Sequence, residues 1–147
     1  MAMTSEMKSE RVGFGKIAQA TAVAGVGSAV ANSVVWFIGN AIAGLKVPLA
    51  EVLVFSLIGA LGGGIVYALL VRFTRKPNTI FIAISAIVLV VYALGPISAA
   101  MAPYMQGAEI FDTATVVAAE LMHLISAAFV VGFLTRLTPA KPSGYAV

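Results

Sequence analysis

Four long apolar stretches dominate the chain, and short groups of polar and turn-forming residues separate them. A helix needs about 20 apolar residues to cross ~30 Å of hydrocarbon. The stretches at residues 17–45, 49–73, 79–101 and 113–137 all meet this length. None alternates strictly between apolar and polar positions, as a membrane β-strand of about 9–11 residues would. The pattern predicts an all-α, polytopic membrane protein with a single domain over residues 1–147.

The residues between the stretches predict where each helix begins and how neighbours are oriented. Pro48 suits the first position of the second helix. Asn78, after Pro77, is expected to cap the third helix, and Asp112 the fourth. Pro96 removes a backbone donor, so a kink is expected between Tyr92 and Pro96. Short connections favour antiparallel neighbours, so we expect an antiparallel four-transmembrane-helix bundle.

The two ends of the chain are expected to be flexible tails, over residues 1–14 and 138–147. The second of these is rich in Pro, Gly and Ser. The apolar region of a cleaved secretory signal spans about 7–15 residues. The first apolar stretch is much longer, so we expect it to be a retained membrane span.

Basic residues predict the orientation in the membrane. Of the nine lysine and arginine residues, only Lys46 follows the first span and precedes the second. The other eight fall on the opposite side: Lys8, Arg11, Lys16, Arg72, Arg75, Lys76, Arg136 and Lys141. The positive-inside rule then places both termini in the cytoplasm, in a bacterial plasma (inner) membrane. Because the basic residues gather at span ends, the net charge of +3 indicates a membrane surface and no nucleic acid partner.

Composition supports the same class of protein. Hydrophobic residues make up 61% of the chain and charged residues 10%, whereas a soluble domain carries about 25% charged residues. Membrane lipids are therefore the expected surroundings. The chain has no cysteine, which excludes disulfides, thiolate metal sites and Fe–S clusters.

The fourth stretch carries two ionisable residues, Glu120 and His123, whose spacing places them on one face of a helix. They lie about 12 and 16 Å inward from Asp112 at 1.5 Å per residue. Ionisable residues at such depth are candidates for function, and Asn32 lies at similar depth. The cluster of Asn32, Glu120 and His123 is open to three interpretations: a hydrogen-bonded packing cluster, a proton relay or solute lining, and a metal site that would require a second copy of the motif.

Asn32 also belongs to a polar stripe on one face of the first helix, with Ser28, Trp36 and Asn40. This stripe is expected to face the bundle interior, since lipid cannot satisfy amide groups. Trp36 and Asn40 are expected near the membrane interface, where an indole is favoured.

Small residues predict where helices approach closely. Gly59 and Gly63 form a GxxxG pair in the second helix, and Gly25, Ala128 and Gly132 offer matching positions in the first and fourth helices. A neighbouring register repeats the spacing with Ala60, Gly64 and Ala68. The glycines are no phosphate-binding loop, because no strand precedes them and no Lys-Ser/Thr follows.

Several short elements together resemble a family of small four-helix bacterial membrane proteins known only as a domain of unknown function. These elements are Ala31-Asn32, Pro48, the basic loop Arg72–Pro77, Leu94-Gly95-Pro96, and Met122-His123-Leu124 followed by Ala127-Ala128. Gly95 stands where the family pattern has a second proline. The resemblance implies the four-helix topology and no particular activity.

No set of residues in the sequence forms a catalytic motif, so no enzymatic activity and no cofactor are expected. We interpret the chain as an accessory or scaffold subunit that packs against other membrane proteins or forms a homo-oligomer. One alternative is a small transporter or proton-linked carrier using Asn32, Glu120 and His123. Another is a lipid, quinone or pigment-binding protein, which would have an apolar cleft beside one of these aromatic residues: Trp36, Phe37, Tyr92 or Phe129.

Overall fold

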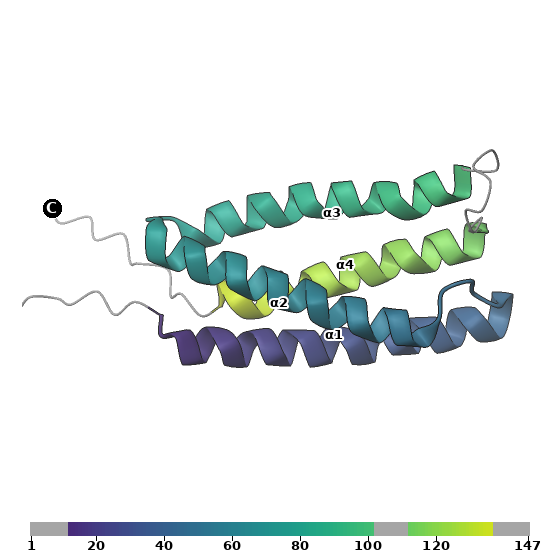
Figure 1. Ribbon diagram of the computed structural model, residues 1–147, viewed down its shortest axis with the longest axis horizontal. Coiled ribbons are helices and arrows are strands. Elements are labelled where there is room, and N and C mark those ends of the chain that lie inside the picture. The colour runs from purple at the N-terminus through teal and green to yellow at the C-terminus, as the bar shows by residue number, and fades with distance from the viewer. Residues whose placement is uncertain (1–11, 102–111, 137–147) are drawn as a thin grey trace, which may run out of the picture.

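The computed structural model describes residues 12–101 and 112–136, which form four helices. These are α1 (Phe14–Ala43), α2 (Leu49–Phe73), α3 (Pro77–Met101) and α4 (Thr113–Thr135). They run alternately up and down in one elongated bundle (Figure 1), and each is long and apolar enough to cross a membrane. The predicted all-α four-helix bundle is therefore confirmed. The predicted tails lie outside the described residues, except for positions 12–14.

The first helix differs from its predicted span at both ends. It begins at Phe14, within the predicted tail, and ends at Ala43. Gly44 adopts a left-handed conformation, with φ of 63°, and its N–H donates to the Asn40 carbonyl at 2.9 Å. Such a cap closes a helix and suits glycine, which has no Cβ to strain.

The third helix begins at Pro77, so the prediction that Asn78 caps it is wrong. Proline is favoured at the first helical position because its missing N–H would be unpaired there in any case. Asn78 instead lies inside the first turn and joins two other helices. Its Oδ1 accepts from the Tyr67 hydroxyl at 2.8 Å, and its Nδ2 donates to the Thr135 carbonyl at 3.0 Å.

The fourth helix begins as predicted, because the Asp112 carboxylate accepts from the Thr115 backbone N–H at 2.7 Å. The third helix continues through Pro96 (Figure 1), and the kink expected between Tyr92 and Pro96 stays a prediction. Proline is tolerated inside membrane helices, where neighbouring groups compensate for the lost backbone bond.

The two ends of the bundle have different contents. We call one the Lys46 end; it holds the α1–α2 connection at residues 44–48 and the start of α4. We call the other the Arg75 end; it holds the α2–α3 connection at residues 74–76, the start of α1 and the end of α4. Apart from Glu120 within α4, the described charged residues divide between them: Lys46, Glu51 and Asp112 at the first, and Lys16, Arg72, Arg75, Lys76 and Arg136 at the second. This separation agrees with the pattern behind the positive-inside prediction, and the membrane orientation itself stays a prediction.

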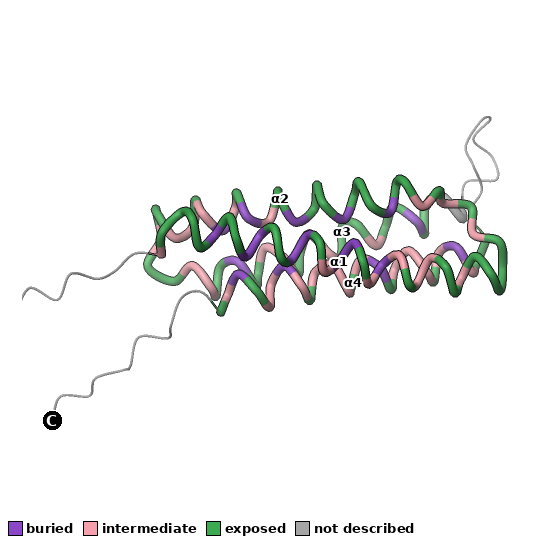
Figure 2. Tube along the Cα trace, turned by 90° about the horizontal axis from the view of Figure 1, so that it is seen from below, coloured by how far each residue is buried: buried purple, intermediate pink, exposed green. Residues whose placement is uncertain are grey.

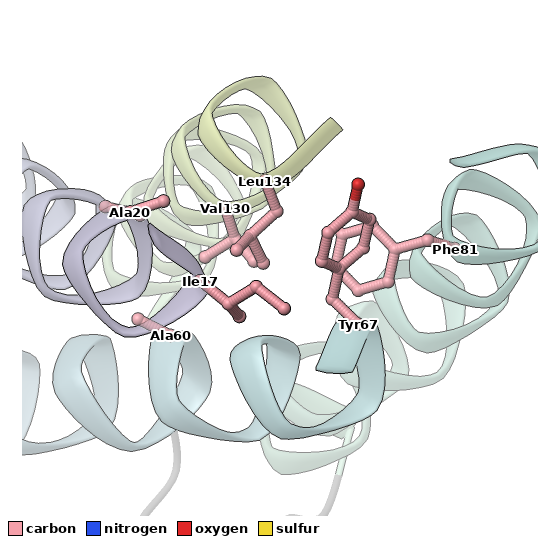
Figure 3. Packing of buried hydrophobic residues seen from close by; sticks show 8 residues of the cluster. Ile17, Ala20, Ala60, Tyr67, Phe81, Val130 and Leu134 are labelled. Carbon is pink, nitrogen blue, oxygen red and sulfur yellow. The ribbon is translucent and has the colours of Figure 1, made fainter. Parts of the chain in front are cut away.

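The hydrophobic core extends from the Arg75 end to the middle of the bundle (Figure 3). It consists of Ile17, Ala20, Ala24, Ala60, Tyr67, Phe81, Val130 and Leu134. The rings of Tyr67 and Phe81 meet edge to face, with centroids 5.2 Å apart. This contact and the Tyr67–Asn78 hydrogen bond join α2 to α3 at the Arg75 end. Toward the Lys46 end α3 diverges from α2 (Figure 1).

Small residues bring α2 close to α1 and α4, at the predicted positions Gly25 and Gly63 and also in the neighbouring register that contains Gly64. Gly64 lies against Thr21, and the space above Gly25 is filled by Ala60, 3.2 Å from where a Cβ would stand. Gly63 lies against Val130 in the same way. The remaining predicted packing positions behave differently: Gly59 and Gly132 have open space where a Cβ would stand, and Ala128 is exposed.

The outer faces of all four helices are largely apolar and exposed (Figure 2). Ile42 on α1 is 80% exposed, and Val90 on α3 is 65% exposed. In water such a surface would be strongly unfavourable, whereas acyl chains cover it at no cost. The structure thus has the small core and apolar exterior of a membrane bundle.

Candidate functional site

A hydrogen-bonded cluster joins three helices near the middle of the bundle. The Asn32 side chain on α1 is 3% exposed. Its Nδ2 donates to Ser56 Oγ on α2 at 2.9 Å and to Ser126 Oγ on α4 at 2.8 Å. Both amide hydrogens are thereby used. The hydrogen bonds of Asn32 in the described residues thus go to two serines, and none goes to Glu120 or His123.

The neighbouring bonds fix the orientation of the Asn32 amide. Ser56 Oγ donates its only hydrogen to the Val52 carbonyl at 2.7 Å. A serine hydroxyl has one donor and can otherwise only accept, so Asn32 must present its Nδ2 to Ser56. This leaves Asn32 Oδ1 buried and without a hydrogen-bond partner among the described residues.

Above this cluster lies a cleft of about 240 Å³. Three polar residues, Asn32, Ser56 and Ser126, form what we call the floor of the cleft, and its walls are mainly apolar. All four helices and the α1–α2 connection contribute to the lining, which comprises Asn32, Leu45, Val47, Glu51, Val52, Phe55, Ser56, Pro96, Thr115, Ala118, Ala119, Met122, His123 and Ser126. Glu51 and Phe55 are exposed, so the cleft reaches the surface in the half of the bundle nearer the Lys46 end. Beyond Asn32, the hydrophobic core fills the other half.

The rim of the cleft is held by bonds between the α1–α2 connection and the adjacent helices. The Lys46 backbone N–H donates to Thr115 Oγ1 at 3.1 Å, and Trp36 Nε1 donates to the Val47 carbonyl at 2.6 Å. Thr115 is 1% exposed. Its backbone N–H and its hydroxyl, bonded to Asp112, lower the pKa of that carboxyl, and the Lys46 charge adds to the effect. The carboxylate that caps α4 is therefore stabilised in its ionised form.

Of the two predicted ionisable residues, only His123 lines the cleft. Its Nδ1 lies 4.0 Å from Glu120 Oε2, at the outer limit of an ion pair. The ring of His123 also meets the ring of Tyr92 on α3, with centroids 5.9 Å apart. Within the described part of the chain, His123 Nδ1 and Glu120 Oε1 are buried and lack hydrogen-bond partners. The pair is thus close together but not hydrogen-bonded.

The aromatic residues that were expected beside an apolar cleft do not line this one. Trp36 is linked to the cleft only by its hydrogen bond to the lining residue Val47, and Phe37 and Tyr92 are exposed. A second, apolar groove of about 580 Å³ runs between α1 and α4 at the Lys46 end and is open along its length. In residues 12–101 and 112–136, no group of three or more His, Cys, Asp or Glu side chains is placed to hold a metal ion.

Ser56 and Ser126 were missed by sequence reasoning. A signal for Ser56 existed, because it falls in the same register as Ala60 and Gly64, spaced by four residues. Ser126 lies three residues after His123, so both are on the same face of α4. A search for polar partners of Asn32 on the other helices would have found both.

Together, the four candidate spans, the apolar exterior and the small core define a small four-span membrane protein. The chain belongs to a family of unknown function (DUF6069), whose model matches residues 12–140. This agrees with the resemblance seen in the sequence. No curated protein matches the chain, and neither does a solved structure.

Proposed function

We propose that this protein is a non-enzymatic membrane protein that binds one amphiphilic molecule in the cleft above Asn32. The observation that carries the proposal is the buried Asn32 Oδ1, a hydrogen-bond acceptor without a partner among the described residues, on a side chain that lines the cleft. Leaving such an acceptor unpaired costs about 1–3 kcal/mol. A bound molecule that supplies a donor would remove this cost.

The lining of the cleft supports the same proposal. Ligand sites in proteins are mostly apolar, with a few polar groups that fix orientation. Here Val52, Phe55 and Met122 supply apolar wall, and Asn32 and Ser126 supply polar floor. An amphiphile would place its polar end on the floor and its apolar part along the wall.

The carrier alternative has less support in this geometry. A carrier needs access to its site from both sides of the membrane. The cleft reaches the surface in only one half of the bundle, and Tyr67, Phe81 and Leu134 pack tightly in the other half. A one-sided cleft favours binding over transfer across the membrane.

The proposal can be tested by purifying the protein in nanodiscs from native membranes and recording its intact mass under non-denaturing conditions. We expect a bound molecule of defined mass. Ala119→Phe fills the cleft and should abolish this adduct. Ala128→Phe makes the same change on the exposed side of the same helix and should retain it. An adduct that persists in Ala119→Phe, or no adduct in the unmodified protein, contradicts the proposal.

A second candidate function is the accessory or scaffold role suggested by the sequence. Gly59 and Gly132 support it, because both leave open space on the bundle exterior where another helix could approach closely. Cross-linking in native membranes followed by mass spectrometry tests this role. Gly59→Leu should remove a cross-linked neighbour that Gly62→Leu, also open in the bundle, retains. Identical cross-links in the two variants would argue against contact through Gly59.

A further inference from the structure

We infer that the cleft is selective for a neutral hydroxyl group, carried by a long-chain alcohol. The inference rests on the proposed function and names the ligand class for the same cleft. The hydroxyl would donate to Asn32 Oδ1 and accept from the hydroxyl of Ser126. A single alcohol group can do both.

The selection follows from counting donors and acceptors on the floor. Asn32 has used both amide hydrogens on Ser56 and Ser126, so only its Oδ1 is left to accept. Ser126 Oγ already accepts from Asn32, and its own hydrogen has no acceptor among the described residues. Ser56 has given its hydrogen to Val52. The floor therefore has one unused acceptor, Asn32 Oδ1, and one unused donor, the hydroxyl of Ser126, among the described residues.

This arrangement discriminates against ligands that carry only acceptors. A ketone, quinone or ether oxygen could accept from Ser126 but would leave the buried Asn32 Oδ1 unpaired. Sites built to bond a hydroxyl reject analogues that lack it, because the buried polar group stays unsatisfied.

The charges around the cleft discriminate against ionic head groups. The described lining contains no lysine or arginine, so a phosphate or carboxylate would find no counter-charge. The nearby Lys46 contributes its backbone N–H to Thr115 and not to the floor. A cation on the floor would lie against neutral Asn32 and Ser126, whereas the Glu51 carboxylate, which also lines the cleft, is exposed. Burying either charge without a partner is strongly unfavourable.

The apolar part of the ligand would leave the cleft near Phe55 and Pro96. The cleft of about 240 Å³ holds a head group and only part of a chain. Phe55 of α2 lines it and is 65% exposed, and Pro96 of α3 faces it from the other side. The remaining chain would therefore leave the cleft past Phe55, where the lining is exposed, and enter the lipid.

The test uses Trp36, the only tryptophan in the chain, which is bonded to the lining residue Val47. Four probes with the same brominated alkyl chain are titrated into nanodiscs: the primary alcohol, its methyl ether, the carboxylate and the trimethylammonium salt. Bromine quenches indole fluorescence at short range, and Ala119→Phe gives the background from probe dissolved in the lipid. We expect the alcohol to bind about tenfold more tightly than the ether, because the ether loses one hydrogen bond to a buried acceptor. The two ions should bind no better than the ether.

A variant pair assigns the preference to the floor. Asn32→Ala removes the acceptor and should reduce the alcohol-to-ether ratio toward one. Ser126→Ala removes the donor from which both probes accept, so it should weaken both and leave their ratio near its original value. Ser98→Ala makes the same change on an exposed part of α3 and should leave the ratio unchanged. Saturable quenching that is equal for alcohol and ether, or strongest for an ion, overturns the hydroxyl assignment but not the binding proposal. No saturable quenching above the Ala119→Phe background by any probe overturns both.

Discussion

Gly64 on α2 lies so close to Thr21 on α1 that the Oγ1, Cγ2 and Cβ atoms of Thr21 all crowd the place where a Cβ on Gly64 would stand. Threonine is branched at Cβ and stiff in a helix, so it cannot easily turn away. The close approach of α1 and α2 therefore depends on the absence of a side chain at residue 64.

Gly64→Ala should destabilise the bundle. Overpacking costs about 1–3 kcal/mol, partly offset by the gain of about 0.5–1 kcal/mol when alanine replaces glycine in a helix. Gly59→Ala is the matched control, because open space surrounds it on the same helix. Reversible unfolding in mixed detergent micelles should show a loss for Gly64→Ala and a neutral or favourable effect for Gly59→Ala. Equal effects would contradict the close contact with Thr21.

The Tyr67 hydroxyl should contribute to stability through its bond to Asn78, which joins α2 to α3. Figure 3 shows this oxygen pointing away from the apolar cluster around Ile17. We expect Tyr67→Phe to lower the free energy of unfolding by about 0.5–1.5 kcal/mol. Tyr92→Phe, at a ring that is 62% exposed, should have little effect in the same assay. A larger loss for Tyr92→Phe would reverse the assignment.

The N-terminus of α4 should lose protection in acid. The pKa of Asp112 is lowered in the folded protein, chiefly by the Thr115 N–H. Its ionised form therefore stabilises the fold fully above the unfolded pKa, about 3.9, and this stabilisation disappears as pH falls through the lowered folded pKa. Hydrogen exchange of the Thr115 amide measures it as a protection factor that falls in this range. Asp112→Asn keeps an accepting oxygen without a titrating group, so its profile should be flat there.

The orientation can be read from two single-cysteine variants, since the chain contains no cysteine. Lys46→Cys and Arg75→Cys lie in exposed connections at opposite ends of the bundle. In intact spheroplasts, a membrane-impermeant maleimide should label Lys46→Cys and should reach Arg75→Cys only after lysis. The opposite pattern would show that the basic residues face outward.

The architecture was predictable because it depends on features that extend over many residues. Twenty or more apolar residues in a row leave few alternatives to a spanning helix, and Asp112 at the start of α4 is a local capping signal. Asn78 shows where such local reasoning fails. An asparagine after Pro77 can either cap the helix or form hydrogen bonds to other helices. Which of these occurs depends on Tyr67 and Thr135, which are distant in sequence.

The cleft was less predictable, because it depends on which way each helix is rotated about its axis. Asn32 was identified as a polar residue at depth, but its partners are set by the packing of Gly25 against Ala60 and of Gly64 against Thr21. That packing turns Ser56 inward and leaves Gly59 outside. The GxxxG spacing alone could not distinguish the two registers, since small residues occupy both.

The one-sided position of the cleft has a consequence for how a ligand would reach it. A cavity that reaches the surface in only one half of a membrane bundle exchanges with only one leaflet. Its occupancy would follow the mole fraction of the ligand among the lipids of that leaflet, and not its concentration in water. If Lys46 faces outward, as the basic residues predict, that leaflet is the outer one. The protein would then report on the composition of one monolayer while its basic end stays in contact with the cytoplasm.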